Sequence, residues 1–124
     1  LLASKIIDIS PSKALELLEG DNKEVLFLRA KCQRSLEDFE ASLSTILRVL
    51  DYDSGSLDSW LIAGWNSYDL GNFKEANYYF SCAIGCDINC PDALYGKALV
   101  LRSLGRDYSH YQMALKDINE ELII

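Results

Sequence analysis

The feature that most constrains the fold of this chain is an internal period of 34 residues within its 124. A shift by one period brings residues of similar kind together in four sets: Leu26, Trp60 and Leu94; Ala30, Gly64 and Ala98; Leu36, Leu70 and Leu104; Glu37, Gly71 and Gly105. A period of this length is typical of units that bury an apolar face only by stacking on their neighbours. We therefore expect about three stacked units and not one compact globule.

Each unit is predicted to hold two antiparallel helices. Apolar residues recur at steps of three and four, which is the stripe of an amphipathic helix and not the alternation of a strand. The breaks within units fall at 36–38, 70–72 and 104–106, and the breaks between units at 51–56 and 87–91. The third copy slips by one residue after Gly105, so its turn is predicted to be one residue longer.

Large and small side chains alternate in a way that explains how the helices pair. A small residue at Ala30, Gly64 and Ala98 allows a close approach of the second helix of each unit. Small residues on that second helix and large ones beside them complete the expected core: Ser42, Ala76, Phe39, Phe73, Ile46 and Phe80. Glu24, Asp58 and Asp92 place a carboxylate in the first turn of each leading helix, where the helix dipole favours it.

These positions resemble the tetratricopeptide repeat family, and the middle unit matches its pattern best. The matching residues are Trp60, Gly64, Leu70, Gly71, Phe73, Ala76, Phe80 and Ala83. The departures are a late proline at Pro91, Glu37 where glycine is usual, and the insertion in the third unit. The resemblance implies an all-α fold, a right-handed superhelix of antiparallel helix pairs. It divides the chain into a leading helix or partial repeat (1–21) and three repeats (22–55, 56–89 and 90–124).

The two ends of the chain are predicted separately. Ser10 and Pro11 favour the start of a short helix, and residues 1–9 are a candidate for another. The last residues, Leu122–Ile124, are apolar where a closing helix should be polar, so we expect the solenoid to continue in a longer protein or to dock on a partner. The first residues show no signal-peptide pattern, and the absence of a starting methionine favours a fragment of a longer protein.

Composition excludes several classes of function. The formal net charge is −7, which disfavours nucleic acid and anionic membranes as partners. No apolar run approaches the roughly 20 residues that span a bilayer, so membrane insertion is not expected. With 49% apolar residues and no low-complexity tract, disorder is not expected either. Four cysteines without a disulfide pattern favour a reducing compartment, so we expect an intracellular protein, cytoplasmic or nuclear.

The resemblance implies that a peptide or helix binds along the leading helices of the units. The residues expected to line this groove are Phe27, Lys31, Arg34, Leu61, Trp65, Tyr68, Tyr95, Leu99 and Arg102. Apolar anchors on the partner would suit the aromatic residues, and the two arginines would select polar or acidic flanks. The alternative for Trp65, Tyr68 and Leu99 is that they pack between adjacent units.

One subfamily is tested directly by the sequence. Co-chaperone repeats of this family clamp the carboxyl terminus of heat-shock chaperones with lysine, asparagine and arginine. Phe27, Lys31, Ile62, Asp92 and Gly96 occupy the corresponding places, and only Lys31 among them is basic. The clamp is absent, so a heat-shock chaperone tail is not the expected partner.

Other residues with chemical potential are weighed against structural roles. Cys82, Cys86 and Cys90 are spaced by four and could ligate a metal, but this is not zinc-ribbon spacing, and small helix-face residues are the preferred interpretation. His110, the sole histidine, has no recognisable catalytic partner. We expect no cofactor and no resident metal.

The sequence therefore predicts a non-catalytic protein-interaction scaffold, part of a multi-subunit assembly and capable of pairing with a second copy. The first alternative is a helical accessory segment of a larger enzyme or transporter whose chemistry lies outside these residues. The second is a metal-dependent module built on the cysteine ladder.

Overall fold

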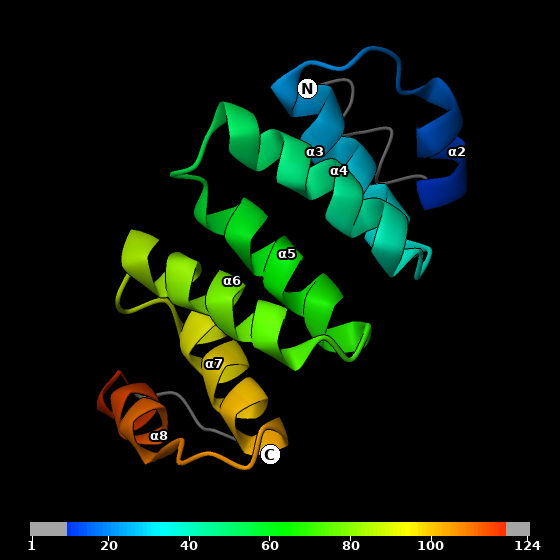
Figure 1. Ribbon diagram of the computed structural model, residues 1–124. Helices are drawn as coiled ribbons and strands as arrows, with labels where there is room; N and C mark the ends of the chain where they lie inside the picture. Colours follow the sequence, from blue (N-terminus) through cyan, green and yellow to red (C-terminus); the bar gives the residue numbers. More distant parts are fainter. Residues whose placement is uncertain (1–9, 119–124) are drawn as a thin grey trace.

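Seven helices stack in chain order from one end of the molecule to the other in the computed structural model, which describes residues 10–118 (Figure 1). They are α2 (Pro11–Leu17), α3 (Lys23–Ser35), α4 (Phe39–Tyr52), α5 (Leu57–Asp69), α6 (Phe73–Cys86), α7 (Pro91–Ser103) and α8 (Ser109–Asp117). This part of the chain contains no strand, so the predicted all-α fold of helix pairs is confirmed. The predictions for 1–9 and for Leu122–Ile124 lie outside the described residues.

The turns inside the units end their first helices in the same way. Glu37, Gly71 and Gly105 each adopt a positive φ, of 61°, 78° and 70°. The next amide then donates a hydrogen bond back to the last turn of the helix, as in Asn72 N to Ser67 O at 2.8 Å. This left-handed cap reverses the chain after three residues in units one and two. The predicted breaks are therefore confirmed.

The third turn is longer than the sequence comparison predicts. Five residues separate α7 from α8, against three between α3 and α4, so the excess is two residues and not one. The reason is local: the carboxylate of Asp107 accepts hydrogen bonds from the amide of Ser109 at 2.9 Å and from its hydroxyl at 2.7 Å. These bonds hold the chain in a turn and delay the helix to Ser109. They also lower the pKa of Asp107.

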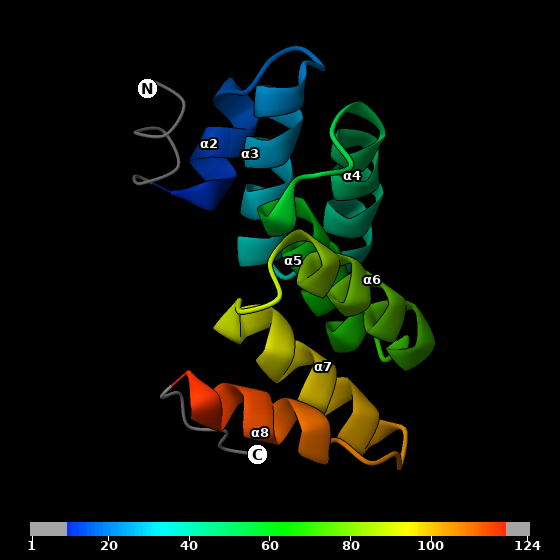
Figure 2. The ribbon, with the colours of Figure 1, turned by 90° about the vertical axis from the view of Figure 1, so that its left-hand side faces the viewer.

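The core consists of two clusters along the stack, with Trp60 packed against both, and Phe80 is the largest fully buried side chain of the described residues. Phe80 projects from α6 against two glycines, Gly64 of α5 and Gly96 of α7. The expected small positions Ala30 and Ala98 are both fully buried. Small residues on the leading helices therefore admit the second helices closely, as the period predicts. Figure 2 shows the consequence, with α3, α5 and α7 following one another along the stack.

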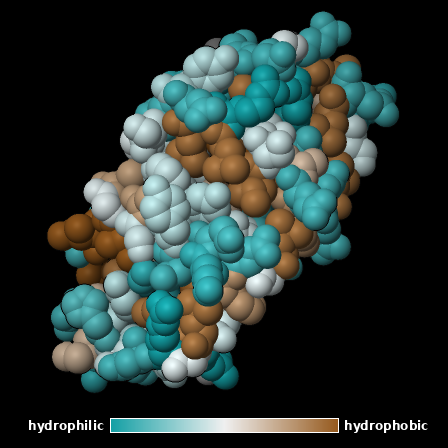
Figure 3. Space-filling model, in the orientation of Figure 1, coloured by the Kyte–Doolittle hydropathy of each residue, from teal (hydrophilic) through white to brown (hydrophobic). Residues whose placement is uncertain are grey.

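Exposed apolar side chains are distributed along the chain. On the face seen in Figure 3 they form separate patches divided by hydrophilic side chains. The large exposed apolar residues of the described part are Leu17, Leu36, Tyr52, Tyr78, Ile88 and Met113. Between residues 10 and 118, no helix is both long and apolar enough to cross a bilayer.

A buried cation lies between the last three helices. Lys97 of α7 is only 9% exposed, and its Nζ donates a hydrogen bond to Ser81 Oγ at 2.6 Å and lies 5.9 Å from the centre of the Tyr111 ring. Burial, helped by the positive charge of Arg106, lowers the pKa of Lys97 below its ordinary value. The folded protein therefore disfavours the charged lysine.

This burial predicts a pH dependence of stability. In the unfolded chain Lys97 has an ordinary pKa of about 10.4, whereas in the folded chain its pKa is lower. The unfolded chain therefore binds more protons between these two pKa values, and the free energy of unfolding increases as the pH rises through this range. Below the folded pKa the penalty is fully present. We expect urea unfolding from pH 7 to pH 10 to show wild type gaining stability relative to Lys97→Met. Parallel curves for the two proteins would contradict the prediction.

Candidate functional site

Two adjoining cavities lie between the first helices of the units. The larger, of about 570 Å³, is lined by Lys31, Arg34, Ser35, Glu37, Phe39, Ile62 and Asp69. The smaller, of about 310 Å³, is lined by Phe27, Lys31, Arg34, Asp58, Leu61, Ile62, Trp65 and Asp92. The two cavities share Lys31, Arg34 and Ile62. We therefore treat them as one groove, defined by the twelve residues that line either cavity.

Helix α5 forms the floor of the groove. Asp58, Leu61, Ile62, Trp65 and Asp69 line it at spacings of three and four residues, which place them on one helix face. Asp69 lies eleven positions after Asp58, a length of about 16 Å along the helix axis. The groove therefore runs parallel to the axis of α5, with carboxylates at both ends and apolar side chains between them.

The structure brings together five of the nine residues predicted to line the groove. These are Phe27, Lys31, Arg34, Leu61 and Trp65. The other four line neither cavity: Tyr68, Tyr95, Leu99 and Arg102. Whether any of the nine contacts a partner stays a prediction.

The aromatic residues Trp65 and Tyr68 of α5 also pack against other helices of the stack. The Trp65 ring lies 4.9 Å from the Phe80 ring and 6.4 Å from the Tyr95 ring, measured between centroids. Tyr68 packs on Phe73 at 5.5 Å. Packing between adjacent units, the alternative weighed for these two residues, accounts for the contact of Trp65 with Tyr95. The contacts with Phe80 and Phe73 join the two helices of the middle unit itself.

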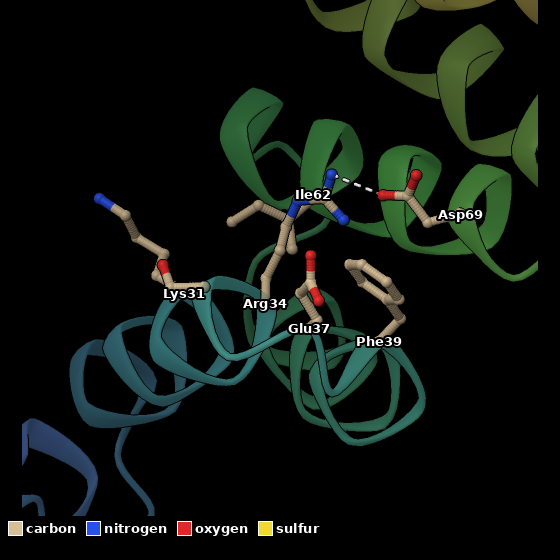
Figure 4. Close-up of a pocket in the computed structure, with 7 residues that line it drawn as sticks. Lys31, Arg34, Glu37, Phe39, Ile62 and Asp69 are labelled. Atoms are coloured by element: carbon tan, nitrogen blue, oxygen red, sulfur yellow. Dashed lines mark ion pairs between the residues drawn. The ribbon is translucent and has the colours of Figure 1, made fainter. Parts of the chain in front are cut away.

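Arg34 is already engaged inside the molecule. Its guanidinium pairs with Asp69 of the next unit at 2.8 Å and donates a hydrogen bond to Asn66 Oδ1 at 2.9 Å. It also lies over the Phe39 ring, 5.3 Å from the centroid. Figure 4 shows Arg34 reaching across the groove to Asp69. The expected selection of acidic flanks by Arg34 would have to compete with these contacts.

Asn66 connects this pair to the core. It is fully buried, and its Nδ2 donates a hydrogen bond to Ser42 Oγ at 2.8 Å, which in turn donates to the carbonyl of Ala30 at 2.7 Å. The network joins α3, α4 and α5 beneath the groove. Sequence reasoning missed Asn66, although the period held a signal: the residues one period away on either side, Cys32 and Val100, are apolar, and the structure buries both.

Glu37, a departure from the family pattern, lines the larger cavity with its side chain. Its φ of 61° is the only positive φ of a non-glycine residue among those described. An L-residue in this conformation costs about 1–2 kcal/mol relative to the usual regions. Figure 4 shows its carboxylate projecting toward α5 between Arg34 and Phe39. A signal was available, because the other two units carry glycine here.

The remaining charges of the groove are mostly negative. Glu37, Asp58 and Asp92 form no ion pair with any other residue between 10 and 118. Asp58 and Asp92 lie in the first turns of α5 and α7, as the sequence predicts, and both also line the smaller cavity. Lys31 lies against Phe27, with its Nζ 5.7 Å from the ring centre. The groove thus has more unpaired carboxylates than unpaired cations.

The cysteines do not converge. Cys82 and Cys86 lie on α6, Cys90 precedes α7, and Cys32 is buried in α3, where burial raises the pKa of its thiol. No group of three or more side chains in the described part is arranged to hold a metal ion. His110 is exposed and rests against Tyr111 at 5.0 Å.

Comparison with known proteins identifies the fold. No family model and no curated protein matches this sequence. Among solved structures, a crystal structure of MamA superposes with a TM-score of 0.84 at 17% identity, over 95% of this chain and 75% of that one. A second MamA crystal structure gives 0.83 at 19% identity, over 99% and 75%. The chain therefore has the fold of MamA, a tetratricopeptide-like helical solenoid.

Proposed function

We propose that this chain is a non-catalytic protein-interaction scaffold, and that its groove takes up a protein segment with an apolar anchor. The observation that supports the proposal is the concave shape of the groove. Two adjoining cavities run along one face of α5, and Ile62 lines both. Ligand sites in proteins are typically concave, with apolar walls and a few placed polar groups.

The groove is also built to hold its shape. Its floor helix is tied to α3 by Arg34 and to α4 by the buried Asn66 bond to Ser42. A rigid, preformed groove lowers the entropy cost of binding a segment. Assembly with other subunits belongs to the same proposal, with the groove as the contact, and self-association is proposed through the apolar ends of the chain.

The proposal predicts that binding depends on Ile62. A displayed library of random peptides would be selected on the whole chain, and the enriched peptides measured by fluorescence anisotropy. Replacing Ile62 with asparagine removes the apolar centre of the groove, so the affinity is expected to fall by about tenfold or more.

The matched control is Ile88→Asn. Ile88 is 70% exposed and lies in the connection between α6 and α7, away from the groove. The Ile88→Asn protein should bind the enriched peptides with the affinity of wild type. Circular dichroism should show equal helicity in wild type, Ile62→Asn and Ile88→Asn. The proposal fails if no peptide is enriched, or if Ile62→Asn binds as tightly as Ile88→Asn.

A further inference from the structure

The charges of the groove are arranged by position, which bears on what the partner carries. Asp58 and Asp92 lie at the end of the groove formed by the first turns of α5 and α7. Glu37 lies at the other end, in the cavity that also contains Asp69. Ile62 lies between them and lines both cavities. An apolar centre is thus flanked by carboxylates on both sides.

The cations of the groove do not neutralise these carboxylates. The guanidinium of Arg34 is committed to Asp69 at 2.8 Å. The ammonium of Lys31 points away from the other labelled side chains in Figure 4 and forms no ion pair within residues 10–118. Three unpaired carboxylates against one lysine leave the groove negative, in a chain whose formal net charge is −7.

Glu37 gives a second and independent reason. The same position in units two and three is Gly71 and Gly105, which accept a positive φ without strain. Glutamate is the unfavourable choice for this cap, and its side chain enters the cavity beside Phe39 and opposite Ile62. A strained residue at a candidate binding site is an indication of function. Phe39 and Ile62 offer apolar surface to the stem of a lysine or arginine whose charge reaches Glu37.

We propose that the partner of this groove is a protein segment with basic residues on both sides of its apolar anchor. The inference rests on the proposed function and adds the charge of the partner to it. The basic residue on one side pairs with Glu37, and the one on the other side pairs with Asp58 and Asp92. The face of α5 in the groove, from Asp58 to Asp69, is about 16 Å long, a length that an extended segment spans in about five residues and a helix in about eleven. Basic flanks thus take the place of the polar or acidic flanks expected from Arg34 and Arg102.

The test compares three versions of one enriched peptide on the whole chain: the parent, a version with its basic residues changed to glutamine, and a version with them changed to glutamate. Affinity should fall by about tenfold with glutamine and further with glutamate, because the carboxylates lose their counter-charges. Raising the salt concentration should weaken the parent and leave the glutamine version nearly unchanged.

Variants of the protein assign each end of the groove. Glu37→Gly is expected to raise the urea midpoint of unfolding, because the strain is relieved, and yet to weaken the parent peptide several-fold. A loss of binding in a more stable protein cannot be a folding defect. The double variant Asp58→Asn/Asp92→Asn should also bind the parent peptide several-fold more weakly. The control Glu40→Gln, an exposed carboxylate in the first turn of α4 outside the groove, should bind like wild type.

The outcomes separate this inference from the proposed function. Enriched apolar peptides that bind equally well with glutamine in place of their basic residues would overturn the inference and leave the groove function standing. Enrichment of acidic flanks would also overturn it. If the protein forms a dimer at rising concentration and Ile62→Asn abolishes it, a second copy of the chain occupies the groove. That result would overturn the inference of a partner segment with basic flanks. Failure to enrich any peptide counts against both.

Discussion

Replacing Gly96 with alanine is expected to destabilise the protein by about 1–3 kcal/mol, even though alanine is the better helix former. The reason is Phe80, which is fully buried and lies between α5 and α7. A Cβ at Gly64 would lie 2.7 Å from Phe80 Cε1, and a Cβ at Gly96 would lie closer still. Phe80 has little room to move, because the Trp65 ring is 4.9 Å away.

The chain provides a matched control for this substitution. Gly85 is an exposed glycine inside α6, and a Cβ there would meet no atom within 4 Å. Gly85→Ala should therefore stabilise the protein by about 0.5–1 kcal/mol through helix propensity. Urea unfolding followed by circular dichroism gives both values. Phe80→Leu should reduce the cost of Gly96→Ala, and a Gly96→Ala protein as stable as wild type would disprove the close packing described here.

Replacing Asn66 with valine is expected to cost about 1–3 kcal/mol. Valine is the residue one period later, at Val100, so the change suits the helix and the burial of the site. It nevertheless removes the Nδ2 donor to Ser42 and the Oδ1 acceptor of Arg34, each within 2.9 Å. A buried polar group that has lost its hydrogen-bond partner lowers the free energy of unfolding, whereas replacing both partners with apolar residues can be nearly neutral.

A double-mutant cycle isolates the network from the packing. Ser42→Ala introduces the residue found one period later, Ala76. If the Asn66 to Ser42 bond stabilises the contact between units, the double variant should cost clearly less than the sum of the two single variants. Strict additivity would show that the two side chains contribute independently. Measuring peptide binding on the same proteins would show whether the network also holds the groove.

The period in the sequence was enough to predict the helices, their pairing and most of the core. Periodicity records burial, so Ala30, Phe80 and Ala98 were placed correctly from spacing alone. The third turn was one residue too short in the prediction, because the bonds from Ser109 to Asp107 depend on local side-chain chemistry that an alignment of repeats does not contain.

The groove was harder to predict, because its character depends on which charges neutralise one another. Nothing in the sequence pairs Arg34 with Asp69, which are 35 residues apart and meet only when units one and two stack. The sequence explains Asp58 by its helix start, and Asp92 by its helix start and by a position of the absent chaperone clamp, so neither is among the residues expected to line the groove. Spacing predicts which face a residue occupies, but only the fold shows its partner across that face.

The most direct test of the account uses isoleucine methyl groups as reporters of where a segment binds. Ile62 lies in the groove, whereas Ile84 and Ile88 lie at the end of α6 and in the connection that follows it. In a chain with labelled isoleucine methyl groups, an enriched basic-flanked peptide should shift the Ile62 signal and give intermolecular nuclear Overhauser effects to it. Ile84 and Ile88 should stay unchanged. Contacts at Ile84 or Ile88 with an undisturbed Ile62 would contradict the central claim that the groove is the binding site.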